Sequence, residues 1–409
     1  MSSMQAVLGD VVRLIETGRS PKTLEREAAP NEPGVLKVSA VSWGRFDPAA
    51  AKAMPESFAA PESHRVRHGD FIVSRANTIE LTGAVAISEQ NYPNRYLSDK
   101  LLRLVLDDSR VIPEFLMYAM RGPRARRHIE RFASGTSDSM RNIAQDALLR
   151  TPLTLPPIGA QQEQISWLRC AFGEISTAVN AAAEQLRATH LLRASSLKEF
   201  LGCDPVSAGP GQRGSVAIRL LSVARLESGH TPSRRRPDWW VGPVPWLALP
   251  DIRKLHGKLA LETIETINDA GLANSSARLL PVGTVCLCRD ASIGFVTMLG
   301  RPMATSQHFC NWICDPESLD PEFLMYAFMA SFDYLRALGS GSVLKTIYMP
   351  TIQSFHISAP SIDEQRRIAR TLREQLAAAE ALQKRLAERQ VEIERLPQRI
   401  LAAAFGDAD

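Results

Sequence analysis

Three consecutive arginines, Arg234, Arg235 and Arg236, are the residues of this sequence with the plainest chemical use. They directly precede Pro237 and Asp238, and two tryptophans follow. Guanidinium groups bind phosphate oxygens, and neighbouring aromatic rings offer stacking or apolar anchoring. Because three adjacent arginines in a proline-flanked loop have little structural purpose, we expect this loop to contact nucleic acid.

Two further arginines, Arg75 and Arg289, occupy equivalent positions at the ends of predicted strands. Each could reach a base or a phosphate, and each could equally form a salt bridge. The basic cluster at 124–131 fits a solvated charged face as well as a phosphate contact. The complete set of predicted DNA-binding residues is Arg19, Arg75, Asn77, Arg234, Arg235, Arg236, Arg289 and Lys345, with His256 and Lys258 as weaker candidates.

Catalytic and metal-binding patterns are missing from the sequence. The segment 339–346 resembles a phosphate-binding loop, but Leu344 stands where the second glycine is required. No His-Glu-x-x-His or Gly-x-Ser-x-Gly occurs, and no two cysteines form Cys-x-x-Cys. Cys286, Cys288, Cys310 and Cys314 with His308 could be drawn as a metal cluster, although alternate strand positions suit core packing equally well. We expect no catalytic residue, no metal and no cofactor.

Composition sets broad limits. The chain has 409 residues, 45% of them hydrophobic, and a formal net charge of +4. A slightly basic chain is compatible with a nucleic-acid partner but does not require one. No apolar run is long enough to span a bilayer, so we expect a cytoplasmic protein without membrane contact.

An internal repeat organises the chain. The heptapeptide Pro-Glu-Phe-Leu-Met-Tyr-Ala occurs at 113–119 and again at 321–327. Other matches follow in the same order: 16–21 with 227–232, 69–75 with 283–289, and Pro157, Gln162 and Ile165 with Pro360, Gln365 and Ile368. Two tandem copies of one unit explain this pattern. Each heptapeptide should begin a helix, with proline at the first position and Asp320 capping the second copy.

A long helix should close each copy. Apolar residues recur by threes and fours over 165–186 and 368–400, as in helices that pack along a partner helix. About forty residues give a rod of roughly 60 Å, and Pro397 should kink or weaken the last turns of the second rod. The glycine- and proline-containing segment 202–211 should break any regular element.

These elements predict an α+β fold with a pseudo-two-fold internal repeat. Two tandem mixed α/β domains, 1–157 and 217–359, are separated by two long helices, 158–202 and 360–406, with a linker at 203–216. A two-fold operation makes the two helices an antiparallel coiled coil. The two globular domains would then read two separated sites.

In combination, these motifs resemble the specificity subunits of type I restriction-modification enzymes. The resemblance covers essentially the whole chain, and it rests on the repeated starts at 8–21 and 226–232, the strand at 69–75, the loops at 134–136 and 340–342, the helix entries at 155–165 and 359–368, and the helix exit at 400–406. The sequence departs from the family pattern at Gln161, where glutamate is usual, and at the exit 199–202 of the first helix.

The resemblance implies a non-catalytic subunit that binds double-stranded DNA. Each target recognition domain would read one half of a bipartite sequence. The helices would dock two DNA methyltransferase subunits, and restriction/translocase subunits would join them. Those partners would supply S-adenosylmethionine chemistry and ATP hydrolysis.

Two other functions stay open. A DNA-modifying enzyme, such as a fused methyltransferase or nuclease, would need a catalytic tetrapeptide like Asn-Pro-Pro-Tyr and a cofactor loop, and the chain has neither. A coiled-coil scaffold that binds only protein would account for the heptads but not for two large globular domains.

Overall fold

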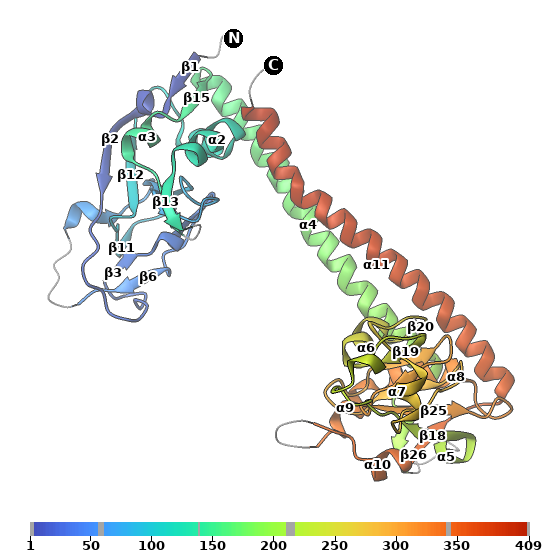
Figure 1. Cartoon of the computed structure of the whole chain (residues 1–409). Coiled ribbons are helices and arrows are strands. Elements are labelled where there is room, and N and C mark those ends of the chain that lie inside the picture. Colours follow the sequence, from blue (N-terminus) through green and yellow to red (C-terminus); the bar gives the residue numbers. More distant parts are fainter. Residues whose placement is uncertain (1–3, 56–60, 138–139, 210–216, 341–344, 407–409) are drawn as a thin grey trace. The chain divides into compact units, whose positions relative to one another are not determined.

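The computed structural model describes residues 4–55, 61–137, 140–209, 217–340 and 345–406. The chain divides into two compact units, Met1–Ala182 with Arg389–Asp409, and Ala183–Glu388 (Figure 1). We call them unit 1 and unit 2. No helix in the described part of the chain has the combined length and apolarity of a membrane span.

Unit 1 is built on two four-stranded sheets. The first is antiparallel, with the order β10 (Val85–Ile87), β8 (Phe71–Ser74), β12 (Leu101–Leu106) and β2 (Val12–Thr17). The second has the order β6 (Ala51–Ala53), β3 (Gly34–Leu36), β11 (Tyr92–Tyr96) and β7 (Arg65–Val66), and β3 and β11 are parallel. Smaller strand groups are β1 (Met4–Val7) with β15 (Pro152–Leu155), β4 (Val41–Ser42) with β5 (Arg45–Phe46), and β13 (Ser134–Ser137), β14 (Met140–Asn142) and β9 (Ala76–Asn77).

Helices cover the first sheet of unit 1. The apolar faces of β8, β12 and α1 (Pro113–Arg121) share one core, in which Phe71, Leu104 and Phe115 are buried. The other short helices of the unit are α2 (Pro123–Phe132), α3 (Gln145–Leu149), η1 (Leu8–Val11), η2 (Val38–Ala40) and η3 (Glu62–His64).

Unit 2 repeats this topology. Its main sheet has the order β18 (Ala224–Ser228), β25 (Phe309–Cys314), β22 (Val285–Cys288), β23 (Val296–Leu299), with β20 (Leu259–Ala260) added at the edge. Its second sheet joins β21 (Glu265–Ile267), β19 (Val244–Leu247) and β24 (Ala304–Thr305), again with a parallel pair, β19 and β24. The third sheet is β16 (Val206–Ala208), β26 (Phe355–Ser358) and β17 (Ala217–Arg219). The short helices are α5 (Leu220–Val223), η4 (Pro237–Trp239), α6 (Leu249–Leu255), α7 (Asp269–Ala273), α8 (Pro321–Ala330), α9 (Phe332–Ala337) and α10 (Met349–Gln353).

Two helices of 44 residues each complete the fold, α4 (Ile158–Leu201) and α11 (Ile362–Phe405). In unit 1 the beginning of α4 packs on the end of α11, since Leu168 and Leu401 share an apolar cluster and Gln164 Nε2 donates to Ala404 O at 3.1 Å. In unit 2 the end of α4 meets the beginning of α11, with Leu197 and Leu372 in one core. The two helices are therefore antiparallel.

Helix α11 continues through Pro397 to Phe405. Proline removes one hydrogen bond of the helix, and the expectation that it kinks or weakens the last turns stays a prediction. One local expectation was wrong. Residues 206–208, inside the predicted linker, form β16 and pair with β26; residues 210–216 lie outside the described part.

The helix junction is the most exactly repeated part of the scaffold. Buried Gln161 accepts a hydrogen bond from Ile112 N at 2.9 Å and donates to Pro156 O and Arg110 O, both at 2.9 Å. In unit 2, Gln365 accepts from Asp320 N at 2.9 Å and donates to Pro360 O and Ser318 O. Gln161, rather than Gln162, is thus the counterpart of Gln365, and the register predicted for this helix was wrong by one residue.

Two ion pairs repeat in the same register. Arg169 holds both carboxylate oxygens of Glu114 in unit 1, and Arg373 holds those of Glu322 in unit 2. The predicted cap is confirmed, since Asp320 Oδ1 accepts from Phe323 N at 2.9 Å. These contacts fix the heptapeptide helix against the long helix in the same way in both units.

Candidate nucleic-acid interface

The arginine loop of unit 2 connects β18 to β19. Arg234 forms a bidentate ion pair with Glu265, with 2.8 Å between Nη2 and Oε2, and its guanidinium carbon lies 3.6 Å from the ring centre of Trp240. The hydrogen bond from Arg234 lowers the pKa of Glu265. Arg236 pairs with Asp238 at 2.9 and 2.7 Å. The expectation that these arginines have little structural purpose is therefore wrong for Arg234 and Arg236, because both shape the loop.

Arg235 differs from its two neighbours. Its side chain is exposed, and among the described residues it has no ion-pair or hydrogen-bond partner. Its backbone N–H alone is engaged, at 3.4 Å from Ser233 Oγ. The ordered arginines on either side hold Arg235 at the loop surface, where its charge is available to an anion.

Trp246 anchors the arginine loop to the second sheet. Its indole Nε1 donates to His230 O at 3.1 Å, and its ring meets Trp240 edge-on at 4.8 Å. Trp246 is almost fully buried and pairs with Ala304 across the parallel strands. Burial of a tryptophan whose N–H is satisfied makes this anchor a rigid one.

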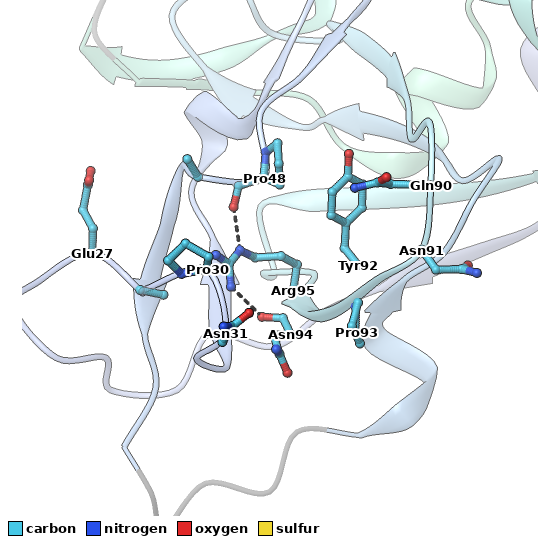
Figure 2. A pocket seen from close by; sticks show the side chains of 12 residues that line it. Glu27, Pro30, Asn31, Pro48, Gln90, Asn91, Tyr92, Pro93, Asn94 and Arg95 are labelled. Carbon is cyan, nitrogen blue, oxygen red and sulfur yellow. Dashed lines mark hydrogen bonds between the residues drawn. The ribbon is translucent and has the colours of Figure 1, made fainter.

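Unit 1 anchors the corresponding loop, residues 18–33, with a different residue. Arg95 donates to the carbonyls of Ala29 at 3.1 Å and Glu32 at 2.9 Å. It also donates to those of Pro48 at 2.5 Å and Asn94 (Figure 2). Arg95 pairs with Gly34 across the parallel strands, where unit 2 pairs Ala304 with Trp246. The loops are therefore anchored at the same pair of positions, by Arg95 opposite Gly34 in unit 1 and by Trp246 opposite Ala304 in unit 2.

A hollow of about 460 Å³ lies beside Arg95. Figure 2 shows Tyr92 and the amides of Asn31, Gln90, Asn91 and Asn94 around it. Amide side chains can pair with the edges of bases, and an aromatic ring can stack on them. Arg95 itself is buried and fully engaged with carbonyls, so it holds the wall in place and does not meet a ligand.

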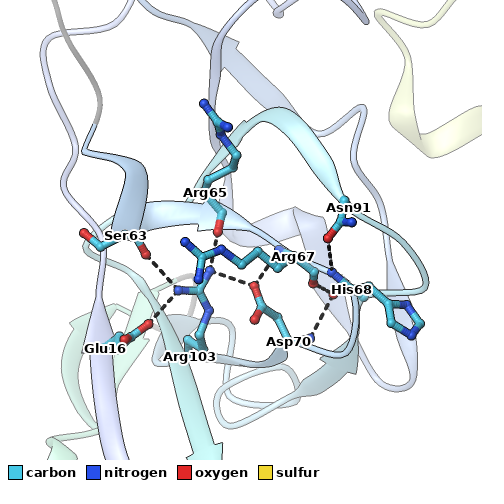
Figure 3. A network of polar contacts seen from close by, with 9 residues as sticks. Glu16, Ser63, Arg65, Arg67, His68, Asp70, Asn91 and Arg103 are labelled. Carbon is cyan, nitrogen blue, oxygen red and sulfur yellow. Dashed lines mark hydrogen bonds and ion pairs between the residues drawn. The ribbon is translucent and has the colours of Figure 1, made fainter.

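A second buried arginine, Arg103, is also structural. It binds Glu16 at 2.6 Å, Asp70 at 2.7 Å and Ser63 O at 2.8 Å, and it also donates to Arg65 O (Figure 3). These contacts tie β2 and β12 to η3, to β7 and to the turn before β8. Removing this side chain would leave two carboxylates unpaired, which is a role in stability and not in recognition.

The other predicted residues divide by exposure. Arg19 and Lys345 are exposed, and residues 341–344 of the loop before Lys345 lie outside the described part. Arg75 and Arg289 are half-buried and bond Asn142 Oδ1 at 3.3 Å and Gln307 O at 3.4 Å. Asn77 is buried. Its Nδ2 donates to Ser74 Oγ and its Oδ1 accepts from Thr78 N, so it supports the chain at 74–78 from inside.

The basic cluster at 124–131 is largely tied to the scaffold. Arg126 donates to Thr82 O at 2.6 Å and Ile79 O at 2.8 Å, and its guanidinium lies over Trp43. Burial lowers the pKa of Arg126. Arg124 donates to Thr154 Oγ1. Arg124 and Arg126 thus hold α2 against β15 and the turn between β9 and β10.

The cysteines of unit 2 belong to the core. Cys286, Cys288 and Cys310 are buried, and burial raises the pKa of Cys288 and of Cys310 to about 12. Within the described ranges, no group of three or more His, Cys, Asp or Glu side chains is arranged to hold a metal ion.

The sequence did not point to Arg95 or Trp246 as loop anchors. They are different residue types. Arg95 lies on β11 and Trp246 on β19, which corresponds to β3 and not to β11, so a comparison of repeated sequence positions does not relate them. The pairing register of the parallel strands is the observation that relates them.

Residues 213–389 match the family model described as "Type I restriction modification DNA specificity domain". The chain is 28% identical over 156 residues to the MjaIX specificity subunit of Methanocaldococcus jannaschii and 26% identical over 194 residues to the EcoEI specificity subunit of Escherichia coli. These alignments cover 38% and 47% of this chain and about a third of each relative, 36% and 32%. The crystal structure of the HsdS subunit from Thermoanaerobacter tengcongensis superposes with a TM-score of 0.64 at 18% identity, over 99% of this chain and 96% of that one. The shared fold thus extends beyond the shared sequence.

Proposed function

We propose that the chain is a specificity subunit of the type I restriction-modification kind, as these matches support, and that it reads a bipartite DNA sequence with one recognition domain per half-site. The observation that carries this proposal is the repeated scaffold with two differently built loops. Unit 1 offers an amide-bordered hollow beside Arg95, whereas unit 2 offers an arginine loop on Trp246. Different side chains at corresponding places suit different base sequences, because contacts to base edges specify and shared contacts only position.

We place the recognition domains at 1–157 and 217–359 and give the long helices the role of docking two methyltransferase subunits. Exposed apolar side chains along these helices support that role, since isolated helix faces in water are normally polar. They are Trp167, Leu191, Leu192, Leu382 and Val391. Restriction/translocase subunits would join through the methyltransferases, and all chemistry would reside in these partners.

Methylation mapping tests the proposal directly. The chain is co-expressed with its methyltransferase partner, and modified adenines are located in DNA exposed to the complex. We expect two short motifs with a constant gap between them. A continuous motif, or methylation that does not depend on this chain, would contradict bipartite reading; tight S-adenosylmethionine binding by the chain alone would favour an enzyme instead.

The loop arginines provide a residue-level test. Replacing all three with alanine should weaken DNA binding without releasing the methyltransferase. Among single variants, Arg235→Ala should remove one phosphate contact and reduce the slope of log affinity against log salt by about 0.9. Arg370→Ala, which removes one exposed arginine of α11 outside this loop, is the matched control and should leave that slope nearly unchanged. Equal slopes for the Arg235 variant and the wild type would remove this side chain from the interface.

A further inference from the structure

A basic groove lies within unit 2, between the α6 segment and the two long helices. Its volume is about 800 Å³. One wall is α6 and the turn after it, with Arg253, Lys254 and Lys258. The other wall comes from α4, through Arg193, and from α11, through Glu380, Lys384 and three alanines, Ala377, Ala381 and Ala387.

The charge of the groove is strongly one-sided. Five lysine and arginine side chains line it, and Glu380 is the one carboxylate among its lining residues. Glu380 is occupied by Lys258 at 2.5 Å. Arg253 donates only to Ser292 Oγ, at 3.3 Å. Among the described residues, Arg193, Lys254 and Lys384 have no carboxylate partner, so most of the positive charge is uncompensated.

His256 belongs to the wall and adds no charge. Its Nδ1 accepts a hydrogen bond from Val296 N at 3.1 Å, and its ring packs between Phe295 and Phe332. Burial, together with the nearby Arg193, lowers the pKa of His256 to about 4. A neutral, half-buried imidazole supports the neighbouring basic side chains and is not itself an anion ligand.

The shape of the groove favours a long polyanion over a small one. It is wide and open, and on α11 Ala377, Ala381 and Ala387 line it beside Glu380 and Lys384, so these small side chains leave the helix surface low. A row of lysine and arginine side chains along such a surface matches the regular charge of a nucleic-acid backbone. In the corresponding segment of unit 1, 38–45, Arg45 is the one basic residue, so Arg253 and Lys254 have no basic counterpart there.

We propose that this groove binds the phosphate backbone of double-stranded DNA and contributes a contact that is independent of base sequence. The proposal rests on the proposed function and adds to it a site outside the recognition loops. Phosphate contacts of this kind hold the duplex in position while base contacts select the sequence. The groove would therefore raise the affinity for every duplex equally.

The test uses the chain assembled with its methyltransferase partner and a 30-base-pair duplex of random sequence as the probe, alongside the mapped target once it is known. A double variant, Lys254→Ala with Lys384→Ala, removes two exposed charges that have no partner to strand. Arg301→Ala with Arg370→Ala, two exposed residues of unit 2 outside the groove, removes the same number of charges and controls for net charge. Affinity is measured between about 50 and 200 mM salt.

We expect the double variant to lose affinity for both probes by the same factor and its salt slope to fall by about 1.8, at about 0.9 per phosphate contact. The affinity lost across this salt range should then be roughly tenfold smaller than in the wild type. The control should keep most of the wild-type slope. A normal melting temperature for the variant shows that folding is not the cause.

Three results would overturn the inference. If the wild-type complex binds DNA and the double variant keeps its slope, the groove is not a DNA contact, although the proposed function stands. If only the target and not the random duplex is affected, the groove is a specific reader. If the variant instead loses its protein partner with an unchanged slope, the groove is a docking surface for an acidic protein. Absence of any DNA binding by the wild-type complex would refute the proposed function itself.

Discussion

Replacing Gln161 with alanine should destabilise unit 1 by about 3 kcal/mol. The side chain is fully buried and makes three hydrogen bonds, with Ile112 N, Arg110 O and Pro156 O, all at 2.9 Å. A neutral hydrogen bond contributes about 1 kcal/mol net, so their sum gives the figure. Because alanine leaves the N–H of Ile112 and two carbonyls without their partner, the damage is concentrated where α1 meets α4.

Gln162→Ala is the matched control, because Gln162 is the next residue of the same helix and its side chain is exposed. Hydrogen exchange of the peptide that contains Ile112 gives the local readout, and chemical unfolding gives the global one. A loss of 3 kcal/mol corresponds to roughly hundredfold faster exchange if opening of this junction limits it. Similar exchange in the two variants, or a larger effect from Gln162, would show that Gln161 does not hold the junction and that the register relating it to Gln365 is mistaken.

Three further predictions follow from other parts of the scaffold. Gly18→Ala should prevent unit 1 from folding, since the added Cβ would lie 1.8 Å from Leu97 O. Gly173→Ala places its Cβ in open space on α4 and should raise stability by up to about 1 kcal/mol. Thermal unfolding of both variants checks this pair of expectations. The pKa of His256 is lower in the folded state than in the unfolded chain, so the unfolded chain binds this proton first as the pH falls. Unit 2 should therefore keep its full stability above pH 6.5 and lose about 3 kcal/mol as the pH falls towards 4. His256→Gln should remove this part of the pH dependence in denaturant titrations. Arg95→Ala removes the anchor of loop 18–33, and we expect limited proteolysis to cut that loop faster while the arginine loop of unit 2 stays as resistant as before.

The sequence was sufficient to predict the duplication, the two long helices and the Asp320 cap. These follow from repeated residues and from helical periodicity, which the chain displays openly. The register of the helix entries could not be settled in this way. Gln161 and Gln162 are adjacent and chemically identical, and burial alone distinguishes them.

The interface was harder to predict than the fold. Arg234, Arg235 and Arg236 look alike in the sequence, yet Glu265 lies 31 residues after Arg234 and Asp238 only two after Arg236. Which arginine stays free depends on partners that strand pairing brings together. The groove residues show the same difficulty on a larger scale, because Arg193, Lys254 and Lys384 come from three helices and share no motif.

The contacts at the helix junction repeat in the two units, whereas the contacts that anchor the loops do not. This difference affects how such a protein can change what it binds. The junction contacts, through Gln161 with Gln365 and Glu114 with Glu322, are the same in both units and do not touch the loops. The loop anchors differ, and each is local to its own second sheet. Since contacts without shared partners act nearly independently, a new loop with its own anchor can replace an old one at little cost to the helix junction. Independence of this kind lets the two loops diverge while the helix junction is kept.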